Sequence, residues 1–264
     1  MFESPLRRTT VVAFANQKGG VGKSTTAINL GAALSGMGEQ ILIIDCDPQS
    51  NATSGLGIDR RFVDKSVYDV ILGEATLDEI ILPTGVDRLA LAPSSIDLAA
   101  VEIELVARFS RERQMAIAID KLGYEYDFVF IDCPPSLGLI TVNALTAADE
   151  VIIPIQAEYY ALEGLSQLLK SIQAIQLNLN PTLEIEGAVI TMLDRRTTLG
   201  TDVAQQVREH FGSKAYQAVI PRTVRLAEAP SFGEPIEAFD PKSRGAIAYR
   251  ELAEEFRRRH GRRS

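Results

Sequence analysis

The chain has 264 residues, 46% of them hydrophobic, which is enough for a sizeable buried core. Its formal net charge of −8 argues against a protein that coats nucleic acid by bulk charge, although it is compatible with a local basic patch. It contains no run of about 18 uncharged apolar residues, and its start lacks a secretory signal, so we expect a cytoplasmic protein with no stable membrane association. The two cysteines, Cys46 and Cys133, lack metal-ligand spacing and are expected to be buried.

Short apolar runs rich in Val and Ile recur along the chain. Their hydrophobicity is continuous rather than alternating, which predicts strands covered on both faces, as in a parallel sheet. The runs occupy residues 10–15, 41–45, 89–92, 128–132, 151–155, 187–191 and 218–221. Helical patterns lie between them, at 24–35, at 98–121 as one or two helices, and at 160–176.

This alternation predicts an α/β fold, a doubly wound and mostly parallel sheet between two layers of helices. We expect one domain over residues 1–264, with a short N-terminal arm (1–9) and a basic C-terminal tail (257–264). The tail RRRHGRRS has the opposite sign to the rest of the chain. A solvated helix end is the favoured interpretation and a binding role the alternative. Residues 46–76 are rich in turn formers, and their structure is left open.

The stretch NQKGGVGKSTT, residues 16–26, nearly matches the phosphate-loop pattern G-x-x-x-x-G-K-[ST], but Gln17 stands where the first glycine belongs. A predicted strand before it and a helix after it supply the context that such a loop needs, which a chance cluster would lack. Backbone N–H groups and the helix N-terminus would surround the phosphates. Lys23 would reach the β- and γ-phosphates, and the Ser24 hydroxyl would ligate Mg²⁺. The predicted nucleotide-binding residues of the loop are Lys18, Gly19, Gly20, Val21, Gly22, Lys23, Ser24 and Thr25.

Aspartates end two other predicted strands. Asp132 follows four apolar residues and is costly there without a partner, so we favour a role in holding Mg²⁺ over a turn or helix cap. Asp45 and Asp47 end the run ILIIDCD, and two like charges so close together favour a nearby cation. Because ligands bind beyond the carboxyl ends of the strands in such sheets, these residues are the first candidates for a site.

Five blocks together resemble the ParA/Soj family of chromosome- and plasmid-partitioning ATPases. They are NQKGGVGKSTT, IIDCDPQSNATSGLG, FIDCPPSLGLITVNAL, IPIQAEYYALEGLSQLL and VIPRTVRLAEAPSFGEPI. The KGGVGK variant alone indicates the wider deviant Walker A class of P-loop NTPases, and the other blocks narrow it to the ParA branch. The resemblance spans residues from about 10 to about 255 and implies a slow, Mg²⁺-dependent ATPase that a partner stimulates.

The resemblance also implies roles for individual residues. Lys18 matches the signature lysine, which reaches across an ATP-dependent homodimer to the phosphates of the facing subunit. Gly19 would lie close to that subunit, so a side chain there should obstruct closure. Asp47 matches the residue that orients the attacking water, and Asp45 would support the magnesium shell. Lys18, Lys23 and Asp47 are therefore the predicted catalytic set.

The remaining implied contacts concern the base and DNA. Pro221 and Thr223 fall in the block that forms part of the purine pocket, although many relatives have asparagine at the Thr223 position. The arginines that match the family's non-specific DNA surface are Arg196 and Arg225, with Arg222 and Arg195 as neighbours of less certain role. A ParB/Spo0J-type centromere-binding protein is the implied partner, and the implied location is the nucleoid.

Three other functions are weighed against this one. A MinD-like membrane-associated regulator of cell division would need a terminal amphipathic helix, which RRRHGRRS does not resemble. An iron–sulfur ATPase is disfavoured because both cysteines lie inside the nucleotide motifs. A metabolic kinase with a degenerate loop would phosphorylate a small acceptor, whereas we expect net hydrolysis to ADP and phosphate.

Overall fold

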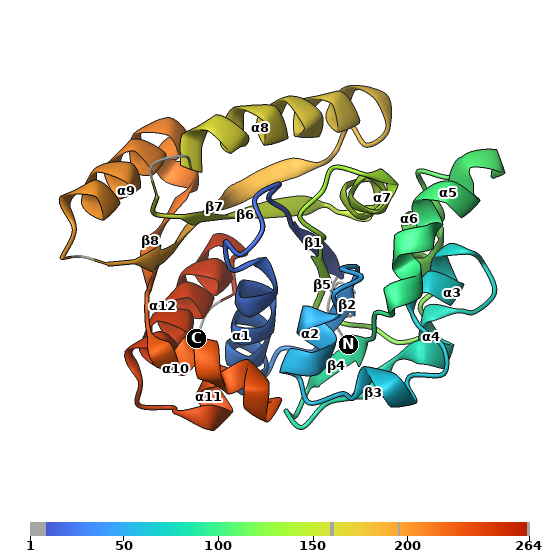
Figure 1. Cartoon of the computed structure of the whole chain (residues 1–264), viewed down its shortest axis with the longest axis horizontal. Helices are drawn as coiled ribbons and strands as arrows, with labels where there is room; N and C mark the ends of the chain where they lie inside the picture. Colours follow the sequence, from blue (N-terminus) through green and yellow to red (C-terminus); the bar gives the residue numbers. More distant parts are fainter. Residues whose placement is uncertain (1–8, 159–160, 195, 263–264) are drawn as a thin grey trace, which may run out of the picture.

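A computed structural model of the chain describes residues 9–158, 161–194 and 196–262 (Figure 1). Its centre is an eight-stranded sheet in the order β3-β4-β2-β5-β1-β6-β7-β8. All neighbouring strands pair in parallel except β3, which runs antiparallel to β4. The strands are β1 (Thr10–Phe14), β2 (Ile41–Asp45), β3 (Leu82–Pro83), β4 (Leu89–Ala92), β5 (Phe128–Asp132), β6 (Glu150–Gln156), β7 (Glu184–Leu193) and β8 (Ala215–Pro221). The seven predicted strands are all present, and the two-residue β3, which ends in a proline, is the addition.

Helices cover both faces of this sheet, which gives the predicted three layers (Figure 1). One face carries α1 (Lys23–Gly36), α2 (Asn51–Gly55), α10 (Val224–Glu228), α11 (Ile236–Phe239) and α12 (Arg244–Arg259). The other carries α3 (Val67–Ile71), α4 (Leu77–Ile80), α5 (Val101–Glu104), α6 (Gln114–Ile119), α7 (Leu139–Ala147), α8 (Ala161–Asn178) and α9 (Thr198–Phe211). Short 3₁₀ turns lie at Arg60–Phe62, Ile96–Ala100, Leu105–Ala107, Gly212–Lys214 and Ala229–Phe232. The strands at the centre are buried on both faces, as their continuous hydrophobicity predicts.

The prediction of one or two long helices over residues 98–121 is wrong, because the helices in this segment are only four and six residues long. The segment forms short pieces instead, and Ser110 interrupts them with a left-handed φ of 51°. A buried side chain holds the break in place, because Asn143 of α7 donates to the Arg111 carbonyl (2.7 Å) and accepts from the Met115 N–H (3.2 Å). A tertiary contact therefore overrides the helical pattern here.

The predicted basic tail is also corrected. Helix α12 runs through Arg259, and three arginines of the tail are largely buried in ion pairs rather than solvated. Arg257 pairs with Glu39 at 3.1 Å, and Arg262 pairs with the same carboxylate and lies over the Phe128 ring. Arg259 pairs with Glu255 at 2.8 Å. The cluster fastens α12 to the amino-terminal edge of the sheet. Arg263 and the N-terminal arm up to residue 8 lie outside the described residues.

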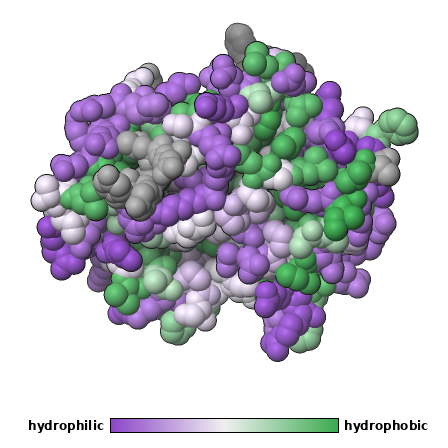
Figure 2. Space-filling model, turned by 45° about the horizontal axis from the view of Figure 1, so that its top comes forward, coloured by the Kyte–Doolittle hydropathy of each residue, from purple (hydrophilic) through white to green (hydrophobic). Residues whose placement is uncertain are grey.

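The surface is mostly polar, but apolar side chains gather on the side where α5–α7 lie (Figure 2). The large apolar side chains exposed there include Ile96, Ile103, Val106 and Phe109, the last 97% exposed. Exposed apolar clusters of this kind mark surfaces that contact other molecules. Among the described residues, no helix combines the length and the apolar character that crossing a membrane requires.

Candidate functional site

The phosphate loop connects β1 to α1 at the centre of the sheet. Gly20 (φ 74°) and Gly22 (φ 89°) take left-handed backbone conformations, which explains the glycines at these two positions. Helix α1 begins at Lys23, with Gly22 as its N-cap residue, so its first N–H groups open toward the loop. Thr191 of β7 donates a 2.7 Å hydrogen bond to the Val21 carbonyl and fixes the loop from the neighbouring strands. The loop therefore has the shape of an anion-binding site.

Lys23 lies in the interior, with 6% of its surface exposed. Burial lowers the pKa of its ammonium group, while the Asp132 carboxylate acts in the opposite direction. A buried lysine beside a carboxylate and a helix N-terminus is placed to bind an anionic ligand at its exposed end. This is the position that the loop pattern predicts for the lysine of the β- and γ-phosphates.

Asp132 is the clearest sign that a ligand belongs here. Its side chain is fully buried at the tip of β5, and neither carboxylate oxygen has a hydrogen-bond partner among the described residues. Burial, and then the neighbouring Asp45 carboxylate, raise the pKa of Asp132 well above its usual range, although Ser24 and Lys23 oppose that shift. Buried polar groups are almost always satisfied, so this carboxylate calls for a cation.

Asp45 lies beside Asp132 in the register of β2 and β5, but its oxygens are already used. They accept hydrogen bonds from the Thr53 N–H (2.8 Å), the Thr53 hydroxyl (2.7 Å) and the Asp47 N–H (3.1 Å). Burial raises the pKa of Asp45 to about 6 against those hydrogen bonds. In this structure Asp45 thus positions Asp47 and the start of α2, and its predicted place in the magnesium shell stays a prediction.

Hydrogen bonds from both its backbone groups and its side chain hold Asp47 in place next to Asp45. Its Oδ1 accepts from the Gln49 N–H at 2.9 Å, and its carbonyl accepts from the Ser94 hydroxyl at 2.6 Å. The residue is 5% exposed, and its carboxylate is close enough to Lys23 at the start of α1 to raise the pKa of that ammonium group. Both the N–H and the carbonyl of Asp47 are hydrogen-bonded, so its carboxylate can orient a water molecule from a fixed position.

The residues present fit a hydrated Mg²⁺ ion. The Asp132 carboxylate has two unpartnered oxygens, and the Ser24 hydroxyl faces it from the first turn of α1. The described residues contain no group of three His, Cys, Asp or Glu side chains that could bind a metal alone. Mg²⁺ takes one or two carboxylates and completes its shell with water and phosphate oxygens, and the Asp132 carboxylate with the Ser24 hydroxyl can supply the protein's part. When bound, it supplies positive charge to those phosphate oxygens.

Lys18 and Gly19 lie on the exposed side of the loop. The Lys18 side chain is 38% exposed and its ammonium group contacts Glu158 at 2.9 Å. A Cβ at Gly19 would meet nothing nearer than the Pro135 Cβ, 3.8 Å away, so the subunit itself has room for a side chain there. Neither residue is needed to build the loop, which separates them from Gly22 and Lys23.

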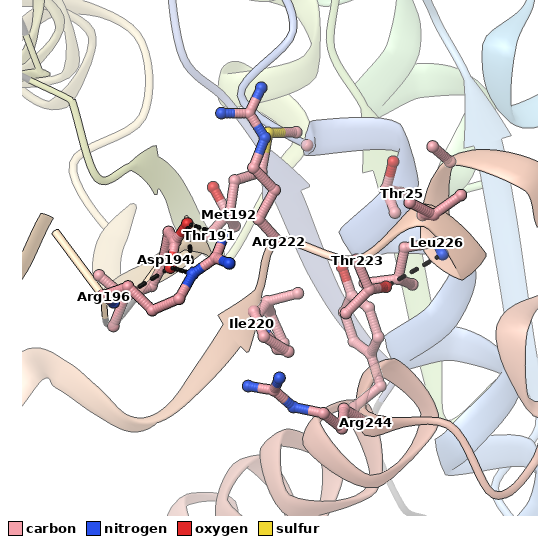
Figure 3. Close-up of a pocket in the computed structure, with 16 residues that line it drawn as sticks. Thr25, Thr191, Met192, Asp194, Arg196, Ile220, Arg222, Thr223, Leu226 and Arg244 are labelled. Carbon is pink, nitrogen blue, oxygen red and sulfur yellow. Dashed lines mark hydrogen bonds and ion pairs between the residues drawn. The ribbon is translucent and has the colours of Figure 1, made fainter.

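A cavity of about 720 Å³ continues from the loop between β7, β8 and α12 (Figure 3). Its volume is within the range of sites for drug-sized ligands and cofactors. Gly22 and Thr25 form the end next to the phosphate loop, and Pro221 and Thr223 line it from the end of β8. The Thr223 hydroxyl accepts from the Leu226 N–H at 3.2 Å as the N-cap of α10. The predicted base contacts are therefore adjacent to the loop, with the Thr223 side chain engaged in capping.

The predicted DNA-binding arginines are partly neutralised by acidic neighbours. Arg196 folds onto Asp194 with contacts of 2.7 and 2.9 Å, and these hydrogen bonds lower the pKa of Asp194 to about 2 (Figure 3). Arg225 pairs with Glu228 at 3.1 Å and Asp240 at 3.2 Å. Arg196 and Arg222 line the cavity, while Arg225 lies outside its lining, and Arg195 is outside the described residues.

Comparisons with known proteins agree with this geometry. A family profile described as an AAA domain matches residues 9–185. The sporulation initiation inhibitor protein Soj of Bacillus subtilis is 54% identical over 245 residues, covering 93% of this chain and 97% of that protein. The chromosome partitioning protein ParA of Caulobacter vibrioides is 51% identical over 257 residues, covering 97% and 95%.

The chain belongs to the ParA/Soj family of chromosome-partitioning ATPases. Solved structures also share this fold, and one of them contains a nucleotide analogue and magnesium. A Mycobacterium smegmatis protein titled cobyrinic acid a,c-diamide synthase, solved with an ATP analogue and magnesium, is 40% identical with a TM-score of 0.85, and 96% of each chain is covered. The cell division ATPase MinD of Pyrococcus furiosus is 28% identical with a TM-score of 0.77, covering 95% and 99%. The fold is that of a P-loop NTPase, as predicted.

Several residues of this ParA/Soj site are missing from the predicted site residues, although Thr53 and Glu158 stand within the quoted family blocks. Thr53 and Ser94 hold the two aspartates, Glu158 holds Lys18, and Met192 lines the cavity with a left-handed φ of 53°. They come from segments whose pattern predicts ordinary turns or strands, and the sheet brings them to the loop. Strained backbone in a non-glycine residue at a cavity is typical of functional sites.

Proposed function

We propose that the protein is an ATP-dependent dimerising switch that binds DNA non-specifically and drives chromosome or plasmid partitioning. It would bind ATP with Mg²⁺ in the phosphate loop, close as a homodimer, bind DNA in that state, and return to monomers after hydrolysis to ADP and phosphate. A ParB/Spo0J-type protein would stimulate hydrolysis, and the protein would work in the cytoplasm on the nucleoid, as a single ATPase domain. The names of relatives at 46% and 51% identity, both chromosome partitioning proteins, support partitioning.

The observation that carries this proposal is the placement of Lys18 and Gly19. Both lie on the outer side of a loop whose own phosphate contacts are supplied by Lys23 and the N-terminus of α1. A second cation on the exposed side is in excess for one subunit, but it fits a nucleotide held by a facing subunit. A glycine with free space around it fits a surface on which another chain closes.

Hydrolysis is assigned to residues of the same edge. Asp47 would orient the attacking water, because its backbone is fixed from Ser94 and its side chain borders the loop. Lys23 and the loop N–H groups would hold the phosphates, and Asp132 with Ser24 would hold Mg²⁺. Phosphoryl transfer depends mainly on such positioning and charge stabilisation.

DNA binding is assigned to the arginines around the cavity mouth. Arg196, Arg222 and Arg225 come from segments next to the nucleotide, so a closed dimer would bring two sets of them together. In one subunit, Arg196 and Arg225 are paired with acids, which leaves a weak basic surface. Two weak surfaces in one dimer bind DNA far more tightly than either alone. Phosphate contacts predict a steep loss of affinity with salt and little dependence on base sequence.

The deciding experiment is DNA binding measured without nucleotide, with ADP, with ATP and with a non-hydrolysable ATP analogue. We expect binding only with the two triphosphates, and equal binding in all four states would contradict the switch. Lys18→Ala should retain nucleotide binding but lose both the dimer, measured by light scattering, and DNA binding. Co-sedimentation with acidic liposomes is the parallel arm, and nucleotide-dependent liposome binding without DNA binding would favour the MinD-like alternative.

A further inference from the structure

Lys18 is held by an acidic side chain of its own subunit. Its ammonium group lies 2.9 Å from Glu158 Oε2, and the other carboxylate oxygen accepts a 2.5 Å hydrogen bond from the Gln156 side chain. Gln156 is the last residue of β6, the strand beside β1, so the carboxylate is fixed from the sheet. The Lys18 and Glu158 side chains are 38% and 46% exposed, which leaves the pair open to an approaching molecule.

The pair is one of several ties between the loop and the ends of β6 and β7. Asn16 donates to a backbone carbonyl of β6 at 2.7 Å and accepts from the Lys18 N–H at 3.0 Å, and Thr191 donates to the Val21 carbonyl. Those ties fix the backbone and involve buried side chains. The contact with Glu158 is different, because it fixes only the charged end of Lys18 and does so at the surface.

We propose that Glu158 is a positioning residue that keeps Lys18 within its own subunit until two ATP-bound subunits close. The inference rests on the proposed function, since the competitor for the Lys18 ammonium is the triphosphate of the facing subunit. An ammonium group is a compact charge, so it leaves one anionic partner when it moves to another. A triphosphate competes better with a carboxylate than a diphosphate does. Releasing Lys18 from Glu158 costs the same with either nucleotide, so Glu158 raises the threshold for dimer closure, and the triphosphate is the ligand that exceeds it.

Glu158→Gln tests this restraint, because it removes the negative charge and keeps the shape. The readout is the dimer dissociation constant, measured by sedimentation with Mg²⁺ and a non-hydrolysable ATP analogue. An exposed ion pair of this kind accounts for roughly a 1.4-fold to 5-fold effect, and each dimer breaks two, so we expect a constant roughly 2-fold to 25-fold lower than wild type. The variant should also form more dimer with ADP. A constant that is unchanged or higher would overturn the proposal.

Glu79→Gln is the matched control. It breaks the Lys65–Glu79 pair, which has a similar length of 3.1 Å and similar exposures of 47% and 51%, far from the loop in sequence. It changes the net charge by the same amount and should leave the dimer constant at the wild-type value. Thermal unfolding of both variants checks that each is folded, as expected for side chains about half exposed.

The outcomes separate this inference from the function on which it rests. If the wild type forms no dimer with the ATP analogue, the proposed switch fails and the inference falls with it. If the wild type forms the dimer and the Glu158→Gln constant equals it, only the inference fails. If both charge-removing variants tighten the dimer equally, net charge is the cause and Glu158 has no special place.

Discussion

The two edges of the sheet handle charge in opposite ways. At the carboxyl edge, Asp132 is fully buried with no hydrogen-bond partner for either carboxylate oxygen among the described residues, and Lys23 is buried beside it. At the amino edge, Arg257 and Arg259 of α12 and Arg262 in the following turn each meet a carboxylate, and Glu39 accepts two of them. Both edges bury charged groups, but within the described part of the chain Asp132 is the buried carboxylate with neither oxygen hydrogen-bonded, whereas at Glu186 of the amino edge one oxygen pairs with Arg259.

This difference separates function from stability in the same chain. A buried charge with its partner present contributes to the fold, and removing that partner is destabilising. A buried carboxylate without one is a cost that persists because a ligand satisfies it. Substitutions at the carboxyl edge should therefore change ligand chemistry with little loss of stability, and those at the amino edge should do the reverse.

The largest effect should come from Asp47→Ala. The Asp47 carboxylate is expected to orient the attacking water. Without it, we expect the rate of ATP hydrolysis to fall by about 100-fold or more, the lower end of the effect of a positioned acid–base side chain. Nucleotide binding and dimer formation should persist, because Asp47 does not build the loop. Steady-state phosphate release measures the loss, and a variant that hydrolyses ATP at the wild-type rate would show that another residue orients the water.

Arg262→Ala should give the largest change in stability. The side chain is 9% exposed, contacts Asp127 at 3.2 Å as well as Glu39, and covers Phe128. Removing it leaves the buried Glu39 carboxylate with Arg257 as its remaining arginine, so we expect a loss of about 3 kcal/mol in unfolding free energy. Urea unfolding measures the change, and ATP hydrolysis by the folded protein should be unaffected. Arg258→Ala, an exposed neighbour on α12, is the control and should change stability by less than about 0.5 kcal/mol.

Asp132→Asn tests the carboxyl edge, where we expect a substitution to weaken ligand binding without loss of stability. An amide keeps the shape and removes the buried carboxylate, at the cost of its attraction to Lys23, so we expect the ligand-free protein to become more stable by at most about 1–2 kcal/mol. Mg²⁺-dependent nucleotide binding should weaken in the same variant. Thermal unfolding with and without Mg²⁺ and nucleotide measures both effects. A variant less stable than wild type in the ligand-free state would mean that the carboxylate is satisfied within the fold.

The sequence placed the residues of the carboxyl edge at their positions in the fold better than those of the amino edge, while the roles predicted for them stay predictions. Glycines, Lys23 and the aspartates stand at strand ends, where residue type and spacing together indicate phosphate and metal chemistry, and the strands around them are continuous apolar runs. The arginine cluster was misjudged because ion pairs such as that of Arg262 with Glu39 join residues more than 200 positions apart. The spacing of residues in the sequence cannot predict contacts between residues so far apart. The short helices around Ser110 were missed for a similar reason, since Asn143 sets them from another element.

The smallest effect should be a pH dependence at the amino edge. His260 Nε2 lies 2.9 Å from Glu150, its Nδ1 lies 2.8 Å from the Phe256 carbonyl, and its ring packs on Phe128. Burial alone would lower the pKa of His260, but the hydrogen bonds to Glu150 and Phe256, with Glu186 nearby, raise it above its usual value. Both ring nitrogens can donate only in the charged form.

The raised pKa of His260 determines how its contribution to stability changes with pH. A histidine whose pKa is higher in the folded than in the unfolded state binds more protons when folded, so its contribution to stability is complete below the unfolded pKa of about 6.5. The contribution disappears as the pH rises through the folded value. His260→Gln should therefore cost on the order of 1 kcal/mol at pH 6 and less at pH 9. Urea unfolding at the two pH values measures the difference, and His210→Gln at the second histidine, which is exposed, is the control for the substitution itself. A cost at His260 that does not change with pH would mean that the neutral ring makes the contacts, and that packing on Phe128 and Phe256 accounts for its place in the fold.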